Sequence, residues 1–312
     1  PFRQRSLVRI CIAATPSVAI PTLEALLASD HEIVSVITRP DAPAGRGRGL
    51  KSSAVSDWAS ANGITLHKPE SIEEISLLVA ASDLVITIGF GVLLPETTLN
   101  IPKHGFINLH FSLLPRWRGA APVQRALEAG DSITGVTVFQ LDAGMDTGPI
   151  YTSLPFDIEP TVNTSELLLD LSSLGVQAVI SAISQIENGD SPKVQSSDGA
   201  RRANKLSTEE AQINWSKNSL EIVNKIRAFY PNPGAWSTFR AMKIKIESAK
   251  VSELILKPGV IALQGRSVVV GTGNGAIELL SVKAAGKSAM SAQDWANGQH
   301  LLPNEKFEQL NG

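Results

Sequence analysis

Two continuous apolar runs, separated by a stretch with helical spacing, constrain the N-terminal fold more than any other feature of the chain. Residues 7–14 and 32–37 have the composition of buried strands, and residues 17–27 repeat apolar side chains at the spacing of one helix face. A strand, a helix and a second strand in this order form a right-handed parallel unit. The sequence therefore predicts an α/β fold built on a parallel sheet.

The same alternation continues to residue 188. Further helices are predicted at residues 52–62, 71–80, 122–127 and 164–186, and further strands at 64–67, 84–88, 105–110 and 135–141. Polar and turn-forming residues then dominate residues 189–206, where no apolar period survives. This segment is predicted to be a linker between two domains, residues 1–188 and 207–312.

The second domain has a different pattern, with one helix near residues 219–229 followed by short runs of β-forming residues. These runs are 235–239, 244–251, 259–263, 267–271 and 277–282. Several short strands with glycine turns suggest a small β-barrel. The glycines of residues 271–275 lie between two such runs and open no helix, so we expect a hairpin turn there rather than a nucleotide-binding loop.

Three side chains that can donate hydrogen bonds or carry protons follow two strands of the first domain. Asn108 and His110 lie on one face of the strand at residues 105–110, because side chains alternate with a period of two. The strand at residues 135–141 ends at a loop that contains Asp146. Since ligands of open α/β sheets bind beyond the carboxyl ends of the strands, the three side chains are predicted to meet at a ligand site.

This set of side chains suits acyl transfer to an amine. An Asn amide and a protonated imidazole can donate hydrogen bonds to a tetrahedral oxyanion, and an imidazole beside a carboxylate can move a proton near neutral pH. An amine is already a nucleophile, so no thiol or metal is required; the single cysteine, Cys11, lies in an apolar strand and is expected in the core. Taken one at a time, the three residues also fit a turn cap, a core histidine and an ordinary loop acid.

The chain resembles the folate-dependent formyltransferases in the spacing of these residues and their neighbours. The shared motifs are Asn108-x-His110, Ser112–Pro115, Arg118-Gly119 and Asp142-x-Gly144-x-Asp146-Thr147-Gly148, with further similarity at residues 39–41, 45–47, 205–207, 213–215 and 285–290. The resemblance covers nearly the whole chain. It implies a Rossmann-like formyltransferase domain in residues 1–188 and an OB-like, tRNA-binding barrel in residues 207–312.

The resemblance also implies the substrates. The formyl donor would be 10-formyltetrahydrofolate, with no metal, and the acceptor would be the α-amine of methionyl initiator tRNA, which bacterial-type translation uses at initiation. Asn108 and His110 would stabilise the oxyanion, and His110, tuned by Asp146, would move the proton. Folate contacts are expected from Phe90, Gly91, Val92, Leu93, Ser112, Leu113, Leu114, Pro115, Asp142 and Gly144. The glycines around Phe90 equally suit a tight turn.

Basic residues are unevenly distributed along the chain. Residues 1–195 contain 13 Lys and Arg against 20 Asp and Glu, whereas residues 196–312 contain 15 against 10. This balance fits a nucleic-acid-binding part joined to a small-molecule catalytic part, although a solvated lysine-rich surface gives the same count. The candidate tRNA phosphate contacts are Arg39, Arg46, Arg48, Lys51, Arg201, Arg202, Lys205, Lys243, Lys245, Lys283 and Lys287.

Two positions depart from the family pattern. Relatives often carry an arginine at the position of Ala42, where it meets the tRNA acceptor end, so Arg46, Arg48 or Lys51 would have to take that role. The alternative is that this glycine-spaced loop is only a solvated surface loop. Ala14 stands where glycine is common, and we expect little consequence from that change.

The sequence gives no sign of a membrane or secretion segment. Its longest apolar runs are far shorter than the roughly 20 residues that cross a bilayer, and the N-terminal residues lack a signal-peptide core. We expect a cytoplasmic monomer.

Two other functions were weighed. One is an enzyme of the same fold that formylates a small nucleotide-linked amine or hydrolyses formyl-folate, and the second domain argues against it. The other is a non-catalytic RNA-binding protein, and the presence of Asn108, His110 and Asp146 argues against that.

Overall fold

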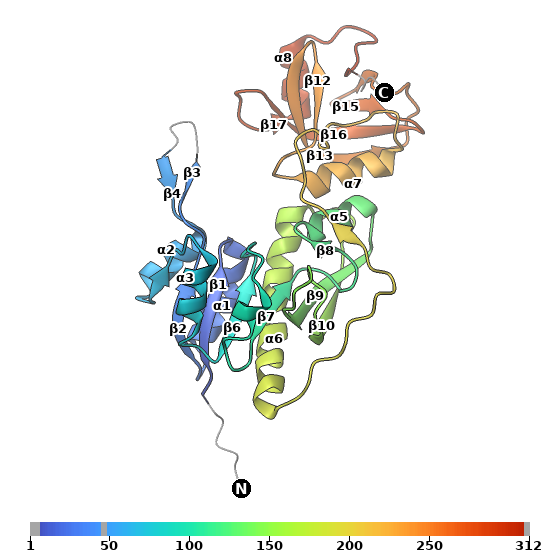
Figure 1. The fold of residues 1–312 in the computed structure, drawn as a ribbon. Helices are drawn as coiled ribbons and strands as arrows, with labels where there is room; N and C mark the ends of the chain where they lie inside the picture. Colours follow the sequence, from blue (N-terminus) through green and yellow to red (C-terminus); the bar gives the residue numbers. More distant parts are fainter. Residues whose placement is uncertain (1–6, 45–48, 309–312) are drawn as a thin grey trace. The chain divides into compact units, whose positions relative to one another are not determined.

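The first compact unit of the computed structural model is built on a seven-stranded sheet; the structure describes residues 7–44 and 49–308 (Figure 1). Across the sheet, the strands are β10 (Ile150–Asp157), β9 (Ile133–Gln140), β7 (Phe106–His110), β6 (Leu84–Ile88), β1 (Arg9–Ala14), β2 (Glu32–Ile37) and β5 (Leu66–His67). The strands from β7 to β5 are parallel, whereas β9 is antiparallel to β7 and β10 to β9. The predicted α/β fold with a mostly parallel sheet is confirmed, and an antiparallel pair forms one edge.

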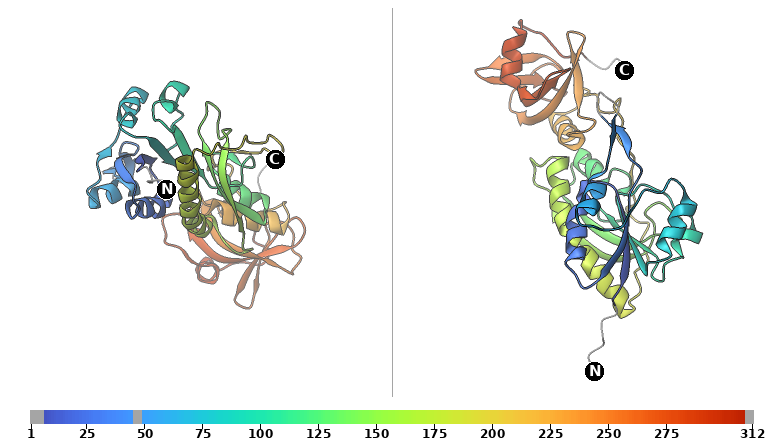
Figure 2. Two further views of the ribbon diagram at one scale, coloured as in Figure 1. Left: turned by 90° about the horizontal axis from the view of Figure 1, so that it is seen from below. Right: turned by 90° about the vertical axis from the view of Figure 1, so that its left-hand side faces the viewer.

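Helices cover both faces of this sheet. They are the 3₁₀ turn η1 (Ser17–Ala19) with α1 (Ile20–Leu27), α2 (Ala54–Ala61), α3 (Ile72–Val79), α4 (Glu96–Leu99) and α6 (Thr164–Asn188). Most of α5 (Pro122–Ala129) belongs to the second unit. Figure 2 shows α3 and α6 on opposite sides of the sheet. Ile75 and Val79 of α3 share one apolar cluster with Cys11 and Val85, so Cys11 is a core residue, as predicted. On the other side, Gly175 of α6 lets the helix approach Leu109, because a Cβ there would lie 2.6 Å from a Leu109 methyl carbon.

Strand β10 and a β-hairpin are among the elements of the first unit that were not predicted from the sequence. Strand β10 lies at the sheet edge, where Pro155 is tolerated because an edge strand can lack one backbone donor. The short strands β3 (Ala42–Ala44) and β4 (Gly49–Lys51) form an antiparallel hairpin. Ala42, the departure from the family pattern, therefore pairs with Lys51 in a hairpin rather than lying in an open loop.

The second unit contains a curled antiparallel sheet that forms a half-barrel. Its strand order is β12 (Trp236–Phe239), β13 (Met242–Ser252), β16 (Ala276–Ala284), β15 (Ser267–Gly271) and β14 (Ile261–Gln264), with β17 (Met290–Ser291) paired to β16. Helices α7 (Ser219–Phe229) and α8 (Ala292–Gln299) belong to the same unit. The predicted OB-like barrel is confirmed in this half-barrel form, and residues 271–275 make the β15–β16 turn.

Aromatic side chains fill the core of the second unit. Trp215 stacks on Phe307 with ring centroids 5.1 Å apart, and Trp295 stacks on the same ring at 5.8 Å. The buried Trp215 indole donates to Ser237 Oγ at 2.9 Å, so its polar N–H has a partner. Phe239 packs edge-on against both Trp295 and Phe307. This cluster joins β12 to α8 and the C-terminal segment.

The chain does not divide into units at a single point. Residues 123–132 and 158–167 belong to the second unit together with residues 204–312. Conversely, residues 189–203, expected to be linker, belong to the first unit, where Lys193 exchanges backbone hydrogen bonds with Ile150 and β11 (Arg202–Ala203) pairs with β8 (Arg118–Gly119). The boundaries at residues 188 and 206 stay a prediction.

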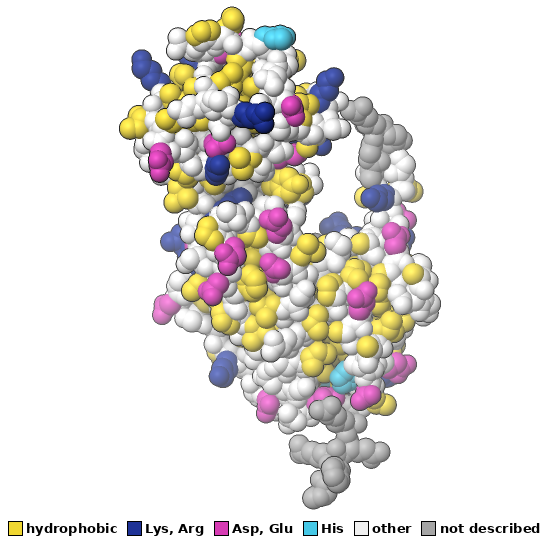
Figure 3. Space-filling view, turned by 180° about the vertical axis from the view of Figure 1, so that it is seen from behind, with side chains coloured by type: hydrophobic (Ala, Val, Ile, Leu, Met, Phe, Trp, Pro, Cys, Tyr) yellow, Lys and Arg dark blue, Asp and Glu magenta, His cyan; other side chains and the backbone are white. Residues whose placement is uncertain are grey.

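Helix α6 is the one helix in residues 7–44 and 49–308 that is long and apolar enough to span a membrane by length and composition alone. Of its most apolar window, 44% is buried inside the structure, and core helices of soluble proteins have the same composition. Hydrophobic side chains on the face in Figure 3 are interspersed with polar and charged ones. The absence of a membrane segment therefore stays a prediction.

Candidate active site

A cavity of about 440 Å³ opens at the carboxyl ends of β6 and β7, against the loop that follows β9, where the sequence predicted a ligand site. We call it the first cavity. Asn108, His110 and Asp146 all line it, together with residues 89–94 after β6. The walls are largely apolar, with Phe90, Leu94, Leu99, Leu109, Phe111 and Leu141 among them. Small-molecule sites commonly have this size and this mixture of apolar walls and few polar groups.

Asn108 is held by Thr87 on the neighbouring strand β6. Asn108 Nδ2 donates to Thr87 Oγ1 at 2.8 Å and to the Thr87 carbonyl at 3.2 Å. Thr87 Oγ1 in turn donates to the Ile107 carbonyl, so it can only accept from Asn108. The orientation of the Asn108 amide is thereby fixed. To donate a hydrogen bond to a ligand oxygen, Nδ2 would have to give up its longer bond, the one to the Thr87 carbonyl. Thr87 also lines the cavity, and the sequence analysis did not identify it.

His110 is buried, with 6% of its surface exposed, and has a partner at each ring nitrogen. Nε2 lies 2.9 Å from the Trp117 carbonyl oxygen, which can only accept, so Nε2 carries a proton. Nδ1 lies 3.8 Å from Asp146 Oδ2. Burial lowers the pKa of His110, while the Asp146 carboxylate and the Trp117 carbonyl oppose that shift. The neutral ring therefore has its lone pair on Nδ1, facing Asp146.

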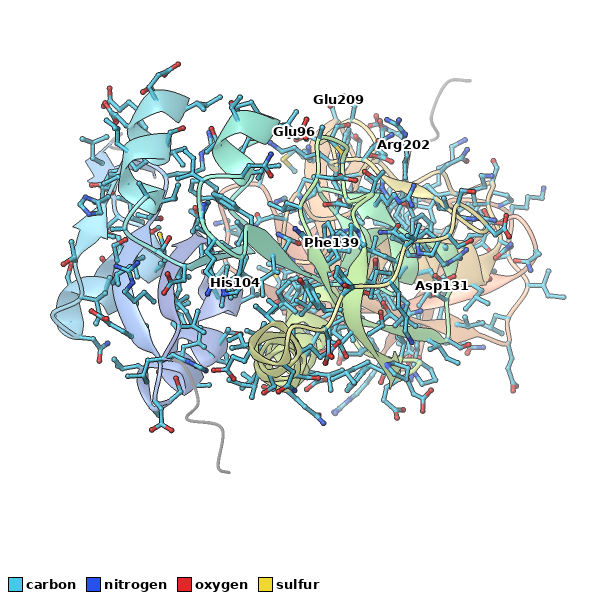
Figure 4. All side chains as sticks on the ribbon, turned by 60° about the horizontal axis from the view of Figure 1, so that its bottom comes forward. Glu96, His104, Asp131, Phe139, Arg202 and Glu209 are labelled. Carbon is cyan, nitrogen blue, oxygen red and sulfur yellow. The ribbon has the colours of Figure 1, made fainter. Side chains whose placement is uncertain are left out.

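The local backbone around His110 is strained. Trp117 has φ of 65° and Asp146 has φ of 54°, values that L side chains rarely adopt. The first orients the carbonyl that accepts from His110, and the second places the carboxylate opposite Nδ1. Phe139 of β9 packs edge-on against the imidazole at 6.4 Å between ring centroids and lies in the interior (Figure 4). Strain of this kind persists only where the surroundings impose it.

The loop that presents Asp146 is fixed by its own hydrogen bonds. Asp146 Oδ2 accepts from the Gly119 N–H at 2.7 Å, and Asp142 Oδ1 accepts from the Gly144 N–H at 3.0 Å and from Thr147 Oγ1 at 2.7 Å. Gly144 has no room for a side chain, since a Cβ would lie 2.0 Å from Thr147 Oγ1. Gly144 and Asp142 therefore hold the loop in the conformation that presents Asp146.

Gln195 supports the same loop from the segment that was expected to be linker. Its Nε2 donates to the carbonyls of Asp146 at 3.2 Å and Gly148 at 3.0 Å. Gln195 could not be identified from the sequence, because a lone glutamine in a polar stretch carries no spacing signal.

The predicted folate contacts fall into two groups. Phe90, Gly91, Val92, Leu93, Asp142 and Gly144 line the first cavity. Ser112, Leu113, Leu114 and Pro115 do not line it. Ser112 Oγ donates to the Arg116 carbonyl at 2.7 Å, and the Leu114 N–H donates to Thr137 Oγ1 at 3.2 Å. These four residues shape the loop between His110 and Trp117, and their contact with folate stays a prediction.

The two glycines beside Phe90, Gly89 and Gly91, have different surroundings. Gly89 has φ of 56°, and a Cβ would lie 2.6 Å from Pro16 Cγ, so the tight turn requires it. Gly91 has φ of 69°, and its Cβ would lie 3.7 Å from Arg39 Nη1. The Arg39 guanidinium therefore lies beside a residue of the first cavity.

Two family models match the chain over most of its length. The model described as "Formyl transferase" matches residues 7–183, and the one described as "Formyl transferase, C-terminal domain" matches residues 205–300. The chain belongs to the formyl transferase family. The resemblance drawn from the sequence motifs is thereby confirmed.

Relatives within the formyl transferase family cover the chain almost completely. A protein of Salinispora tropica named methionyl-tRNA formyltransferase is 41% identical over 307 residues, which are 96% of this chain and 99% of that protein. HypX from Aquifex aeolicus, solved with tetrahydrofolic acid, has a TM-score of 0.67 at 18% identity over 96% of this chain. The chain spans about half the length of HypX, 49%.

A third similarity is to another solved structure. An N-formyltransferase from Helicobacter canadensis, solved with folinic acid and dTDP-3-aminofucose, has a TM-score of 0.67 at 21% identity and covers 88% of this chain and 99% of its own. This likeness shows that the fold extends through most of the chain.

The predicted tRNA contacts of this formyl transferase lie in separate places. Arg46 and Arg48 lie outside the described residues, and Lys51 is exposed on β4. Arg201 and Arg202 are exposed beside β8, and Lys205 is exposed at the start of the second unit. Lys243, Lys245 and Lys283 lie on neighbouring strands of the half-barrel, and Lys287 is exposed in the β16–β17 loop. In residues 7–44 and 49–308 there is no group of three His, Cys, Asp or Glu that could hold a metal.

The lysines of the half-barrel share one row with an aromatic ring. Trp236 pairs with Lys245 across β12 and β13, and Lys245 pairs with Lys283 across β13 and β16. Directly paired residues point to the same face, as do residues two apart, which adds Lys243. The Lys243 Nζ lies 3.8 Å from the centre of the Trp236 ring, and burial together with Lys245 lowers its pKa. We call Lys243, Lys245 and Lys283 the lysine row.

Proposed function

We propose that the chain transfers the formyl group of 10-formyltetrahydrofolate to the α-amine of methionyl initiator tRNA. The observation that carries the chemistry is the meeting of Asn108, His110 and Asp146 around one largely apolar cavity. The acceptor is supported by the likeness to relatives named methionyl-tRNA formyltransferase over 96% of the chain. The product would serve translation initiation, which places the proposed activity in the cytoplasm.

The donor supplies an electrophilic formyl carbon, and the first cavity suits its flat ring system. Phe90, Leu94, Leu99 and Leu141 provide apolar walls, and Asp142 provides a polar edge. Leu93 is 67% exposed and Met145 is 60% exposed, although both line the cavity. A bound apolar ligand would cover such side chains and gain from the burial.

His110 is proposed to move the proton of the reaction. Its neutral ring accepts the proton that the attacking amine loses as the new C–N bond forms, and returns it to the folate nitrogen as the old C–N bond breaks. Asp146 stabilises the transient imidazolium from 3.8 Å, and the Trp117 carbonyl holds the other nitrogen. A buried imidazole with a lowered pKa is ready to accept at neutral pH.

Asn108 is proposed to stabilise the negative charge that develops on the formyl oxygen. Its Nδ2 keeps the 2.8 Å bond to Thr87 Oγ1 and exchanges the 3.2 Å bond to the Thr87 carbonyl for one to that oxygen. A donor that is already oriented costs little reorganisation during the reaction. His110 can add a second donor only after it has been protonated, which makes Asn108 the donor available from the start.

The second unit is proposed to hold the tRNA. Lys245 and Lys283 are directly opposite each other on the sheet, and like charges so placed repel. A phosphate between them would remove that repulsion, and the flat Trp236 beside Lys243 offers a ring for a base. We propose residues 1–188 as the catalytic part, 189–206 as the connection, and 207–312 as the tRNA-binding part of a monomer.

The test is transfer of labelled formyl from 10-formyltetrahydrofolate with four acceptors in parallel: methionyl initiator tRNA, uncharged initiator tRNA, free methionine and water. Labelling of the charged tRNA alone is expected. Formate release without labelled tRNA would identify a hydrolase instead. No turnover with any acceptor would return the chain to a binding role.

A further inference from the structure

A second cavity of about 440 Å³ lies against the same loop as the first. Arg118, Arg201 and Arg202 line it together with Gly144, Met145, Thr147 and Ala200. We call it the arginine cavity. Gly144 and Met145 line both cavities, so one short loop separates them. All of these residues belong to the first unit.

Backbone pairing brings the three arginines together from distant parts of the sequence. Strands β8 and β11 are parallel, and Arg118 is the register partner of Arg202. The Arg118 N–H donates to the Arg201 carbonyl at 2.8 Å. The approach depends on Gly119, which has φ of 128° and where a Cβ would lie 2.6 Å from the Ala203 carbonyl oxygen. A residue with a side chain at this position would push the two strands apart.

Arg118 is held in place by a neutral partner rather than an acid. Its Nε donates to Gln195 Oε1 at 2.8 Å, and its Nη2 donates to Gln195 Oε1 and to the Ser196 carbonyl. Gln195 also binds the carbonyls of Asp146 and Gly148, so one glutamine joins the guanidinium to the loop of the catalytic carboxylate. A guanidinium bound to neutral acceptors keeps its full positive charge for a ligand.

No acid offsets this charge within the cavity. The lining residues include no Asp or Glu, and none of the described carboxylates forms an ion pair with Arg118, Arg201 or Arg202. Arg201 and Arg202 are exposed, and Figure 4 shows Arg202 toward the edge of the view, apart from the label of Phe139. Three uncompensated guanidinium groups around a concave surface favour an anion, and arginine binds phosphate or carboxylate oxygens in pairs.

We propose that the arginine cavity binds an anionic group of a substrate while its reacting end occupies the first cavity. This inference rests on the proposed function, which supplies two sources of that chemistry. One is a phosphodiester close to the terminal nucleotide that carries methionine. The other is a carboxylate of the donor's glutamate. Arg201 and Arg202 are among the tRNA contacts expected from the sequence, and Arg118 belongs to a shared family motif. The role of Gln195 and the cavity itself come from the structure.

The kinetic test uses the variants R201A, R202A and the double variant in the full chain. Both arginines are exposed, so the fold is expected to survive. The KM for one substrate is expected to rise about tenfold in the double variant, the size expected for lost charge-assisted hydrogen bonds, with kcat within about twofold. A rise in the KM for methionyl tRNA identifies the phosphodiester, and a rise in the KM for 10-formyltetrahydrofolate identifies the carboxylate.

The matched control is K103A, which removes an exposed cation of the same unit that lines neither cavity. It is expected to leave both KM values unchanged. An unchanged pair of KM values in the double variant, or an equal rise in K103A, would overturn the proposal, because the arginines would then act only through general charge.

A binding measurement separates this proposal from the proposed function. Titration calorimetry would measure binding of the trinucleotide CCA and, separately, of the tetrahydrofolate monoglutamate, without turnover. A loss of about tenfold in affinity for one of them in R201A/R202A supports the cavity even if the wild-type chain formylates no tRNA. Equal affinities in wild type and variant overturn it even if tRNA formylation is normal.

Discussion

The first cavity and the lysine row use ionisable side chains in opposite ways. In the first cavity, His110 is 6% exposed, has a partner at both ring nitrogens and has a pKa shifted by burial. In the lysine row, Lys283 is exposed and Lys245 and Lys283 lie opposite each other without a described acidic partner. The burial of His110 suits its proposed role in proton transfer, whereas the proposed binding of a phosphate by the lysine row needs charges that a phosphate can reach.

This contrast has an energetic consequence. A buried group with fixed partners acts at one atom, so its loss changes the rate of the chemical step. An exposed lysine contributes a small part of the salt-dependent attraction to nucleic-acid phosphates, so its loss changes the affinity for the nucleic acid.

His110→Asn is expected to lower kcat about 10³-fold, within the range known for general acid–base groups, because the imidazole proposed to move the proton is lost. Single-turnover formylation of methionyl tRNA would measure it. His104→Asn is the control, since His104 is partly exposed, belongs to the same unit and lines neither cavity. Near-normal turnover in His110→Asn with an intact fold would mean that His110 does not move the proton of the reaction.

Asp146→Asn is expected to lower kcat about 10²-fold, since an amide can still accept from Gly119 but cannot stabilise an imidazolium. The pH profile gives an independent readout. His110 must be neutral to accept a proton, so kcat/KM rises with pH through its pKa, which lies below the ordinary value. Asp146 raises that pKa, and its neutralisation is therefore expected to move the acid limb to lower pH. A limb that stays in place would mean that Asp146 does not act through His110.

The double variant K245A/K283A is expected to raise the KM for methionyl tRNA about tenfold and to leave kcat unchanged. The slope of the logarithm of the tRNA binding constant against the logarithm of the salt concentration should become shallower, by the amount expected for the loss of about two phosphate contacts. Lys250→Ala on the same strand is the control, because Lys250 already pairs with Glu278 at 3.0 Å. An unchanged salt dependence would leave the lysine row as an ordinary solvated surface.

Thr87→Val is expected to lower kcat about fivefold, the effect of one neutral hydrogen bond, because Asn108 would lose its shorter partner. Thr87→Ser keeps the hydroxyl and should restore the rate, with the KM for the donor unchanged in both variants. Equal rates in Val and Ser would show that the Thr87 carbonyl alone orients the amide.

Much of the first cavity could be predicted from local patterns. The two-residue spacing of Asn108 and His110 within a strand puts them on one face, and the glycines of the loop after β9 mark a tight structure around Asp146. These features depend on short-range geometry, which sequence carries directly. The fold class followed in the same way from the alternation of apolar runs and amphipathic helices.

The features that escaped prediction depend on contacts between distant segments. Gln195 reaches Asp146 across 49 positions, and Arg118 meets Arg202 through a two-residue strand pair that no periodicity marks. Ser112–Pro115 carry a strong motif, and in the structure Ser112 and Leu114 hold the loop without lining the first cavity. Contact of these four residues with folate stays a prediction. A motif shows that residues matter together but does not say whether they touch the ligand or one another.

Gln195 also changes what kind of segment residues 189–203 are. A connection between units normally tolerates insertions, nicks and changes of length, because its ends are all that matter. Here a register slip of one residue would withdraw the amide from the Asp146 and Gly148 carbonyls and release the Arg118 guanidinium at the same time. The length of this stretch is therefore tied to the proposed catalytic site, and a protease that cuts it is expected to impair the proposed chemistry while leaving every residue of the first cavity in the chain.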